Sequence, residues 1–127
     1  MTQCPKPPRP TEADEQAAVI EWAEYMSGTY PELKLLHHIP NGGSRNKKEA
    51  ANLKRQGVKA GVPDLHLPVP RGKYHSLYIE MKVKPNKPTK EQVKWINALI
   101  DNGNAAIICY SAERAVKAIE YYLTLTR

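Results

Sequence analysis

The sequence lacks several features that would place it in other classes of protein. It contains no phenylalanine, although seven tyrosines and two tryptophans still allow a modest hydrophobic core. Its two cysteines, Cys4 and Cys109, lie far apart and form no CxxC motif, which argues against a disulfide framework or a zinc finger. No apolar run approaches the ~20 residues needed to cross a bilayer, and the N-terminus lacks the apolar segment of a signal peptide. We therefore expect a soluble protein of a reducing cytoplasm.

The chain has the composition of an ordinary folded domain with an excess of positive charge. Its 127 residues suit one domain, with 41% hydrophobic and 25% charged residues. The net charge of +6 favours polyanions such as nucleic acids. Acidic residues concentrate in the first 32 positions, whereas basic residues form two later clusters. The clusters consist of Arg45, Lys47, Lys48, Lys54, Arg55 and Lys59, and of Lys82, Lys84, Lys87, Lys90 and Lys94.

The order of apolar, capping and turn residues predicts eight elements after a flexible, proline-rich leader at residues 1–10. Helices are expected at 11–27, 47–56, 89–101 and 111–123. Strands are expected at 33–39, 64–67, 74–83 and 105–110. The order α-β-α-β-β-α-β-α predicts an α/β fold with a mixed sheet of about four strands flanked by helices. Residues 11–127 are expected to form one domain.

Three polar residues of the predicted strands form a candidate active site. Asp64 begins one strand, and Glu80 and Lys82 share a face of the next, about 6.6 Å apart. If the strands are neighbours, Asp64 reaches Glu80 across the sheet. Two such carboxylates repel unless a cation lies between them, and Mg²⁺ or Mn²⁺ prefers oxygen ligands of this kind. The metal would activate water, and Lys82 would orient it or stabilise charge on a phosphate.

These residues belong to a longer series of motifs that resembles a known family. Pro63-Asp64, followed after fifteen residues by Glu80-Met81-Lys82, resembles the PD-(D/E)XK nuclease superfamily. Within it, the chain is similar to the VRR-NUC family over about residues 12 to 124. The segments that carry this similarity are Asn41-Gly42, Lys54-Arg55-Gln56-Gly57, Gly61-Val62-Pro63-Asp64-Leu65, Tyr78-Ile79-Glu80-Met81-Lys82, and the pair Gln92 and Trp95.

The resemblance implies a restriction-endonuclease-like core with a divalent metal in its active site. Asp64 and Glu80 would bind the metal together with the backbone carbonyl of Met81. A glutamate of the first helix would complete the acidic set. Glu15 is preferred for that role because it lies on the core-facing stripe of the helix, one turn before a buried valine, and Glu12 is the alternative.

Gln92 has two competing interpretations. It matches the family's glutamine on the helix after the lysine-bearing strand, where it would form a hydrogen bond near the catalytic residues. It is also the expected capping-box partner of Thr89, three residues before it. Both roles remain open at this stage.

DNA contacts are expected from the basic clusters and from the Asn-Gly turn before them. The helix at 47–56 carries Glu49 as its one acidic residue, which favours a surface facing phosphates over an ordinary solvated face. The residues expected to bind nucleic acid are Asn41, Arg45, Lys47, Lys48, Lys54, Arg55, Lys84 and Lys87.

Plainer interpretations exist for several of these residues. Asp64 after a proline also suits a simple turn, and Glu80 with Lys82 also suits an exposed pair on a half-solvated strand. Only the joint arrangement favours catalysis over these meanings.

The histidines and tryptophans are expected to be mainly structural. His66 shares a face with the candidate site but is expected to be structural or solvent-facing. One of His37 and His38 is a weaker candidate for a position near the cleft. Trp22 and Trp95 lie at helical core spacing and are expected in the core.

Two classes of function remain. The first is a Mg²⁺- or Mn²⁺-dependent DNA endonuclease, which the resemblance implies acts as a homodimer on branched DNA such as four-way (Holliday) junctions. Short, free-standing members of the family look like phage or mobile-element proteins, so a bacterial or phage-encoded origin is expected. A nuclease for simple duplex or single-stranded ends is a variant of this class. The second class is a non-catalytic nucleic-acid-binding protein, which would gain nothing from carboxylates facing phosphates.

Overall fold

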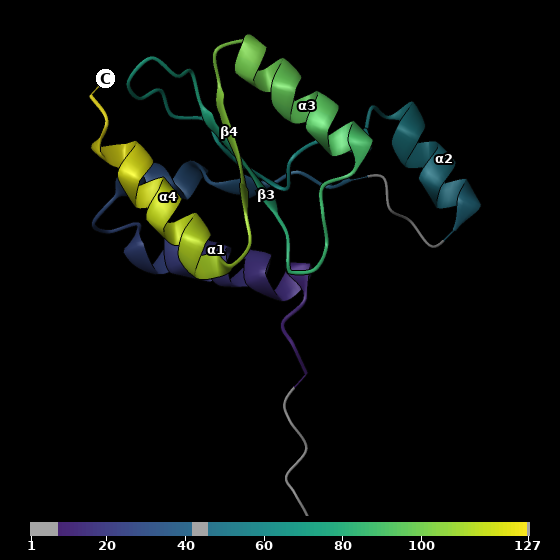
Figure 1. The fold of residues 1–127 in the computed structure, drawn as a ribbon, viewed down its shortest axis with the longest axis horizontal. Coiled ribbons are helices and arrows are strands. Elements are labelled where there is room, and N and C mark those ends of the chain that lie inside the picture. The colour runs from purple at the N-terminus through teal and green to yellow at the C-terminus, as the bar shows by residue number, and fades with distance from the viewer. Residues whose placement is uncertain (1–7, 42–45, 127) are drawn as a thin grey trace, which may run out of the picture.

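Residues 8–41 and 46–126 are described by a computed structural model, in which helices surround a four-stranded sheet (Figure 1). The strands are His37–His38 (β1), Leu65–Leu67 (β2), Leu77–Met81 (β3) and Ala105–Cys109 (β4). The helices are Glu12–Met26 (α1), Lys47–Arg55 (α2), Lys90–Asp101 (α3) and Ala112–Thr124 (α4), with a short 3₁₀ helix at Pro31–Leu35 (η1). The order of helices and strands expected from the sequence is confirmed.

The sheet is mixed, as predicted, and its strands follow one another in the order β1-β2-β3-β4. The first two pairings are antiparallel, whereas β3 and β4 run parallel. Parallel neighbours need a crossover connection, and α3 supplies it between β3 and β4. Helices α1 and α4 pack against each other, and α3 packs on β4 from the other side (Figure 1).

The hydrophobic core lies between the sheet and the α1–α4 pair. Ile79 and Met81 of β3 are almost completely buried there, against Val19 of α1 and Ile119 of α4. Alternate residues of a strand point to opposite faces, so Glu80 points away from this core, toward α3. No helix within the described ranges is long and apolar enough to cross a membrane.

The strand predicted at 33–39 is wrong over most of its length. Pro31 begins the 3₁₀ helix η1 instead, and β1 comprises two residues. Leu33 and Leu36 are both buried, a spacing of three that suits a 3₁₀ turn and not a strand. The apolar pattern therefore reflects one face of a short helix packed on α1.

The strand predicted at 74–83 is shorter than expected. Arg71 and Tyr74 exchange both backbone hydrogen bonds around a tight turn, in which Gly72 has a φ of +56°. Because this turn uses the backbone groups of Tyr74, β3 begins only at Leu77. At the other end of β3, the hydrogen bonding to β4 continues one residue beyond the strand, since the backbone N–H of Lys82 donates to the carbonyl of Cys109.

Helix α3 buries less of its predicted apolar stripe than the sequence suggests. Only Ile96 is buried, whereas Val93 and Ile100 are 41% and 49% exposed. Trp22 packs against the core as expected, but Trp95 is half-buried at the surface, so its assignment to the core is wrong. The reason is that α3 packs on β4, the edge strand of the sheet, which covers one narrow side of the helix.

Candidate active site

The register of β2 and β3 brings Asp64 and Glu80 together. Leu65 pairs with Ile79, so the next position outward places Asp64 opposite Glu80, as expected if the strands were neighbours. The Oδ2 of Asp64 accepts a hydrogen bond of 2.8 Å from the backbone N–H of Met81. The side chain of Asp64 is thereby tied to the strand that carries Glu80.

Glu80 is a buried carboxyl group with strongly altered acidity. The residue is 2% exposed. Burial, followed by the charge of the adjacent Asp64, raises the pKa of Glu80 from its usual 4.5 to about 8, and Lys82 opposes the shift. Two carboxylates share a poorly solvated space, which is a common property of metal-binding and catalytic sites.

Lys82 lies beside both Glu80 and the start of α1. Its Nζ is 3.6 Å from Oε2 of Glu80 and 3.8 Å from Oε1 of Glu12. Lys82 is 6% exposed, so the Glu80–Lys82 pair is not the solvated surface pair of the plainer interpretation. A charged amine held here at the side of two carboxylates can contact a phosphate or a water molecule that enters the site.

Gln92 performs both of the roles that the sequence left open. The side-chain oxygen Oε1 of Gln92 accepts a 2.8 Å hydrogen bond from the backbone N–H of Thr89. The backbone N–H of Gln92 donates to the Thr89 hydroxyl, which completes the capping box. Because Oε1 faces a donor, Nε2 is left to donate, and it does so to Oε2 of Glu80 at 3.1 Å. The start of α3 is thus linked directly to the buried carboxyl group.

The main chain of Asp64 is held by the neighbouring strand. The carbonyl of Asp64 accepts hydrogen bonds from the N–H of Ile39 at 2.7 Å and from Nδ1 of His38 at 2.8 Å. Of the two adjacent histidines, His38 is therefore the one near the candidate site, whereas Nδ1 of His37 bonds to the carbonyl of Leu35. The sequence indicated a histidine there but not which one, nor that it contacts the backbone.

His66 has a structural environment. Its ring stacks on Tyr78 with 4.1 Å between ring centroids, and its Nε2 lies 3.1 Å from the hydroxyl of Ser76. Desolvation, followed by the neighbouring His37, lowers the pKa of His66. These contacts agree with the structural role expected from the sequence.

The first helix brings Glu12 to the site. Its Oε2 accepts a 2.9 Å hydrogen bond from Nδ2 of Asn86, while Oε1 faces Lys82. In the described residues, no hydrogen bond or ion pair joins the Glu15 side chain to Asp64 or Lys82. No sequence signal pointed to Asn86, because it lies 74 positions from Glu12 and meets it only in the folded chain.

Comparisons with known proteins agree with this geometry. The VRR-NUC domain matches residues 10–113 of the chain. The chain belongs to the VRR-NUC domain family. A solved structure described as a VRR_NUC domain protein is similar, with a TM-score of 0.80 and 32% sequence identity over 94% of this chain and 93% of that one. A search of curated proteins finds no match.

Membership of the VRR-NUC family makes this chain a nuclease domain of the PD-(D/E)XK superfamily, with nucleic acid as its substrate. Nucleases of this family generally use divalent metal ions. Among residues 8–41 and 46–126, no group of three or more His, Cys, Asp or Glu side chains is arranged to hold a metal. Mg²⁺ does not need such a group, because it keeps several water ligands and takes one or two carboxylates.

The residues present in this VRR-NUC domain fit a hard divalent cation. Asp64 and Glu80 provide two carboxylates side by side. Burial, followed by the charge of Asp64, raises the pKa of Glu80, and a cation between the two groups would offset both effects. The titratable side chains grouped around Glu80 in the described chain are those of Glu12, Asp64 and Lys82. Apart from Lys82, all members of this group are acidic.

The side chains expected to contact DNA lie at the surface of the VRR-NUC domain. Arg45 lies outside the described residues. The other seven are all exposed, in α2 and in the segments before α2 and after β3: Asn41, Lys47, Lys48, Lys54, Arg55, Lys84 and Lys87. Helix α2 extends away from the body of the fold (Figure 1). It contains no buried residue, and the Asn46 side chain caps its first turn.

Proposed function

We propose that this protein is a divalent-metal-dependent DNA endonuclease that acts on branched DNA as a homodimer. The observation that carries the proposal is the Asp64–Glu80 pair, with Glu80 buried and Lys82 within 3.6 Å of its carboxylate. A protein that only binds DNA is less consistent with this arrangement, because two carboxylates beside a phosphate would weaken the binding.

Each residue of the site has a distinct proposed role. Asp64, Glu80 and the backbone carbonyl of Met81 would hold Mg²⁺ or Mn²⁺. When bound, such an ion lowers the pKa of a water ligand and polarises a phosphoryl oxygen. Lys82 orients the attacking water and stabilises negative charge that develops on the phosphate. Gln92 fixes the carboxylate of Glu80 through its amide N–H, so that the ligand does not rotate out of position.

The carboxylate of the first helix is proposed to be Glu12, the alternative to Glu15 in the sequence prediction. Its carboxylate is anchored by Asn86 and faces Lys82 at 3.8 Å. A negative charge at this distance attracts the lysine side chain and can hold it toward the substrate. Glu15 lies one turn further along α1, and its role stays a prediction.

Support for a branched substrate and a dimer comes from the family resemblance and from the requirement for two cuts. One active site cuts one strand, so symmetric resolution of a four-way junction needs two copies of the site. The exposed cations of α2 and of the loop after β3 provide the charge to contact more than one DNA arm.

A cleavage panel tests the proposed activity. Purified protein is incubated with Mg²⁺ or Mn²⁺ and with duplex, single-stranded, flap and four-way-junction DNA. We expect symmetric cuts in the junction. Glu80→Ala is expected to abolish cleavage while junction binding in EDTA or Ca²⁺ stays within about twofold, and Glu21→Ala, at an exposed position of α1, serves as the control. Equal cleavage by wild type and Glu80→Ala would disprove the assignment.

The oligomeric state is tested separately. Sedimentation at micromolar concentration is expected to show a dimer. A monomer that still cleaves DNA would contradict the junction-resolving function and would leave a simpler nuclease.

A further inference from the structure

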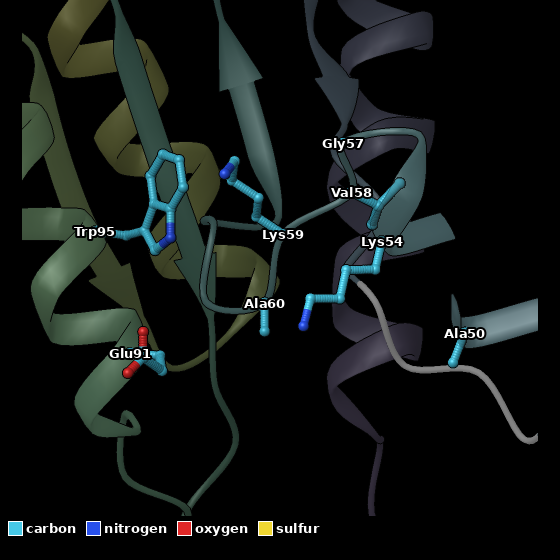
Figure 2. A pocket seen from close by; sticks show the side chains of 8 residues that line it. All are labelled: Ala50, Lys54, Gly57, Val58, Lys59, Ala60, Glu91 and Trp95. Carbon is cyan, nitrogen blue, oxygen red and sulfur yellow. The ribbon is translucent and has the colours of Figure 1, made fainter. Parts of the chain in front are cut away.

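A surface cavity of about 700 Å³ lies between α2 and the first turns of α3 (Figure 2). Its size falls in the usual range for sites that hold small molecules or parts of larger ones. Lys54, Lys59 and Trp95 provide its larger side chains together with Glu91, and the remaining wall consists of Ala50, Gly57, Val58 and Ala60.

A close contact between a loop and α3 forms one wall. Gly61 has a φ of +91°, and a Cβ at this position would lie 2.8 Å from the backbone carbon of Glu91. The loop therefore touches the start of α3 only because residue 61 has no side chain. This contact holds the loop that carries Val58 and Lys59 against α3, so that both residues line the same cavity as Trp95.

The chemistry of the lining suits a nucleotide better than a simple anion or an apolar ligand. Trp95 is half-buried and presents an aromatic surface, while the exposed amines of Lys54 and Lys59 reach the cavity from α2 and the loop (Figure 2). A phosphate alone would be bound by the two lysines without an indole. The carboxylate of Glu91, on the Trp95 side of the cavity, can accept a hydrogen bond from an amino group of a base.

The cavity is joined to the proposed active site through two short connections. Trp95 lies three residues, or about one helical turn, after Gln92, whose amide contacts Glu80. The loop that supplies Lys59 continues directly into Asp64. DNA whose phosphate lies at the Asp64–Glu80 pair would therefore have neighbouring nucleotides within reach of Trp95.

We propose that the cavity binds an unpaired nucleobase of the DNA substrate, which stacks on Trp95 while Lys54 and Lys59 contact the adjacent phosphates. Bases in a continuous duplex are stacked on each other and do not enter such a cavity, whereas bases at a branch or a single-stranded end do. The inference rests on the proposed nuclease function and adds to it a reason for preferring DNA with unpaired nucleotides.

Fluorescence of the tryptophans tests the stacking without requiring cleavage. Protein in EDTA is titrated with a single-stranded oligonucleotide and, separately, with a blunt duplex of the same length. Stacking of a base on an indole quenches its emission, so we expect the single strand to quench the Trp95 contribution and the duplex to leave it almost unchanged. The contribution of Trp95 is obtained by subtracting the signal of Trp95→Phe, which retains Trp22. Equal quenching by both DNAs, or quenching by neither, would overturn the proposal.

Affinity measurements with variants give a second readout. Trp95→Leu keeps an apolar side chain but removes the aromatic face, and we expect about ten- to hundredfold weaker single-strand binding, the loss typical of one base–aromatic stack. Trp95→Phe is expected to retain most of the affinity. Tyr121→Ala removes an aromatic side chain that is 70% exposed on α4, away from the cavity, and is the matched control.

The outcomes separate this inference from the nuclease assignment. Wild-type affinity in Trp95→Leu, with normal cleavage, would overturn the base-binding cavity and leave the nuclease. Quenching by single-stranded DNA without cleavage of any DNA in Mg²⁺ or Mn²⁺ would support the cavity and remove the proposed catalysis.

Discussion

The side-chain amide of Gln92 connects the start of helix α3 to Glu80. Its oxygen accepts from the backbone of Thr89, and its nitrogen donates to the buried carboxyl group at 3.1 Å. One side chain thus stabilises a helix end and orients a proposed metal ligand. Substitutions can separate these two contributions.

The first prediction separates capping from orientation at Gln92. Gln92→Glu retains an oxygen for the Thr89 N–H but places an oxygen against Glu80, so we expect folding to be retained and cleavage to fall about tenfold or more. Thr89→Ala removes the hydroxyl that accepts from the backbone N–H of Gln92 but leaves the hydrogen bond from the Gln92 side chain to Glu80. It should therefore cost about 1 kcal/mol of stability with little loss of cleavage. Rates and unfolding free energies are measured for both. Equal activity of Gln92→Glu and wild type would show that the Glu80 contact is not used.

The second prediction concerns the stability of the metal-free protein. Because the pKa of Glu80 is about 8 in the folded chain and about 4.5 when unfolded, the folded state binds a proton that the unfolded state has lost between these pH values. The unfolding free energy contributed by Glu80 therefore falls as pH rises from 4.5 to 8. In EDTA at pH 8.5, Glu80→Gln should be more stable than wild type by about 1 kcal/mol or more, and near pH 4.5 the difference should largely disappear.

Thermal melts across this pH range measure the effect. Addition of Mg²⁺ at pH 8.5 is expected to raise the melting temperature of wild type and not of Glu80→Gln, because the ion stabilises only a protein that binds it. A Glu80→Gln protein that is less stable than wild type in EDTA at every pH would contradict the prediction.

The third prediction compares the two glutamates of α1. Glu12→Gln removes the charge opposite Lys82, and we expect cleavage to fall about tenfold or more. Glu15→Gln, one turn away on the same helix, should change the rate by less than about threefold. The rates are measured with the same DNA and metal concentration. The reverse ranking would assign the helix carboxylate to Glu15, as the sequence alone suggested.

The fourth prediction concerns the histidine that holds Asp64 from the backbone side. His38→Ala removes the hydrogen bond to the Asp64 carbonyl, which also accepts from the N–H of Ile39. Since one donor remains and His38 is exposed, we expect a stability loss below about 1 kcal/mol and a decrease in cleavage of about threefold to tenfold. His37→Ala is the adjacent control and should leave the cleavage rate almost unchanged. Identical rates for both variants would remove His38 from the site.

The fifth prediction uses two glycines to isolate a steric contact. Gly57 and Gly61 both have positive φ, but a Cβ would meet nothing within 4 Å at Gly57, whereas it would collide with the backbone of Glu91 at Gly61. Gly57→Ala should therefore cost about 1–2 kcal/mol of stability from backbone strain alone. Gly61→Ala should cost about 1–3 kcal/mol more, because the loop must move away from α3. Equal losses in chemical denaturation would show that the collision is relieved without cost.

Local signals in the sequence were sufficient for most of the helices. Thr89 and Ser111 are capping residues at the starts of α3 and α4, and the structure confirms both. The segment at 33–39 was misassigned because so short an apolar run fits either a strand or a short helix, and packing against α1, which buries Leu33 and Leu36, selects the helix. Trp95 was misplaced for a related reason, since helical spacing does not show how much of a helix its neighbours cover.

By itself, the sequence determined that Glu80 and Lys82 share a face of one strand, because they lie two positions apart. The position of Asp64 opposite Glu80 also required the pairing of β2 with β3. The sequence also determined where the excess positive charge lies. Tertiary structure alone decided the contacts between distant segments. The meeting of Glu12 with Lys82 and Asn86 and the choice of His38 depend on how α1 and β1 pack around the central strands. The cavity beside Trp95 depends on where α2 and the loop after it lie relative to α3. Such contacts join residues far apart in sequence, and no local pattern encodes the distance between them.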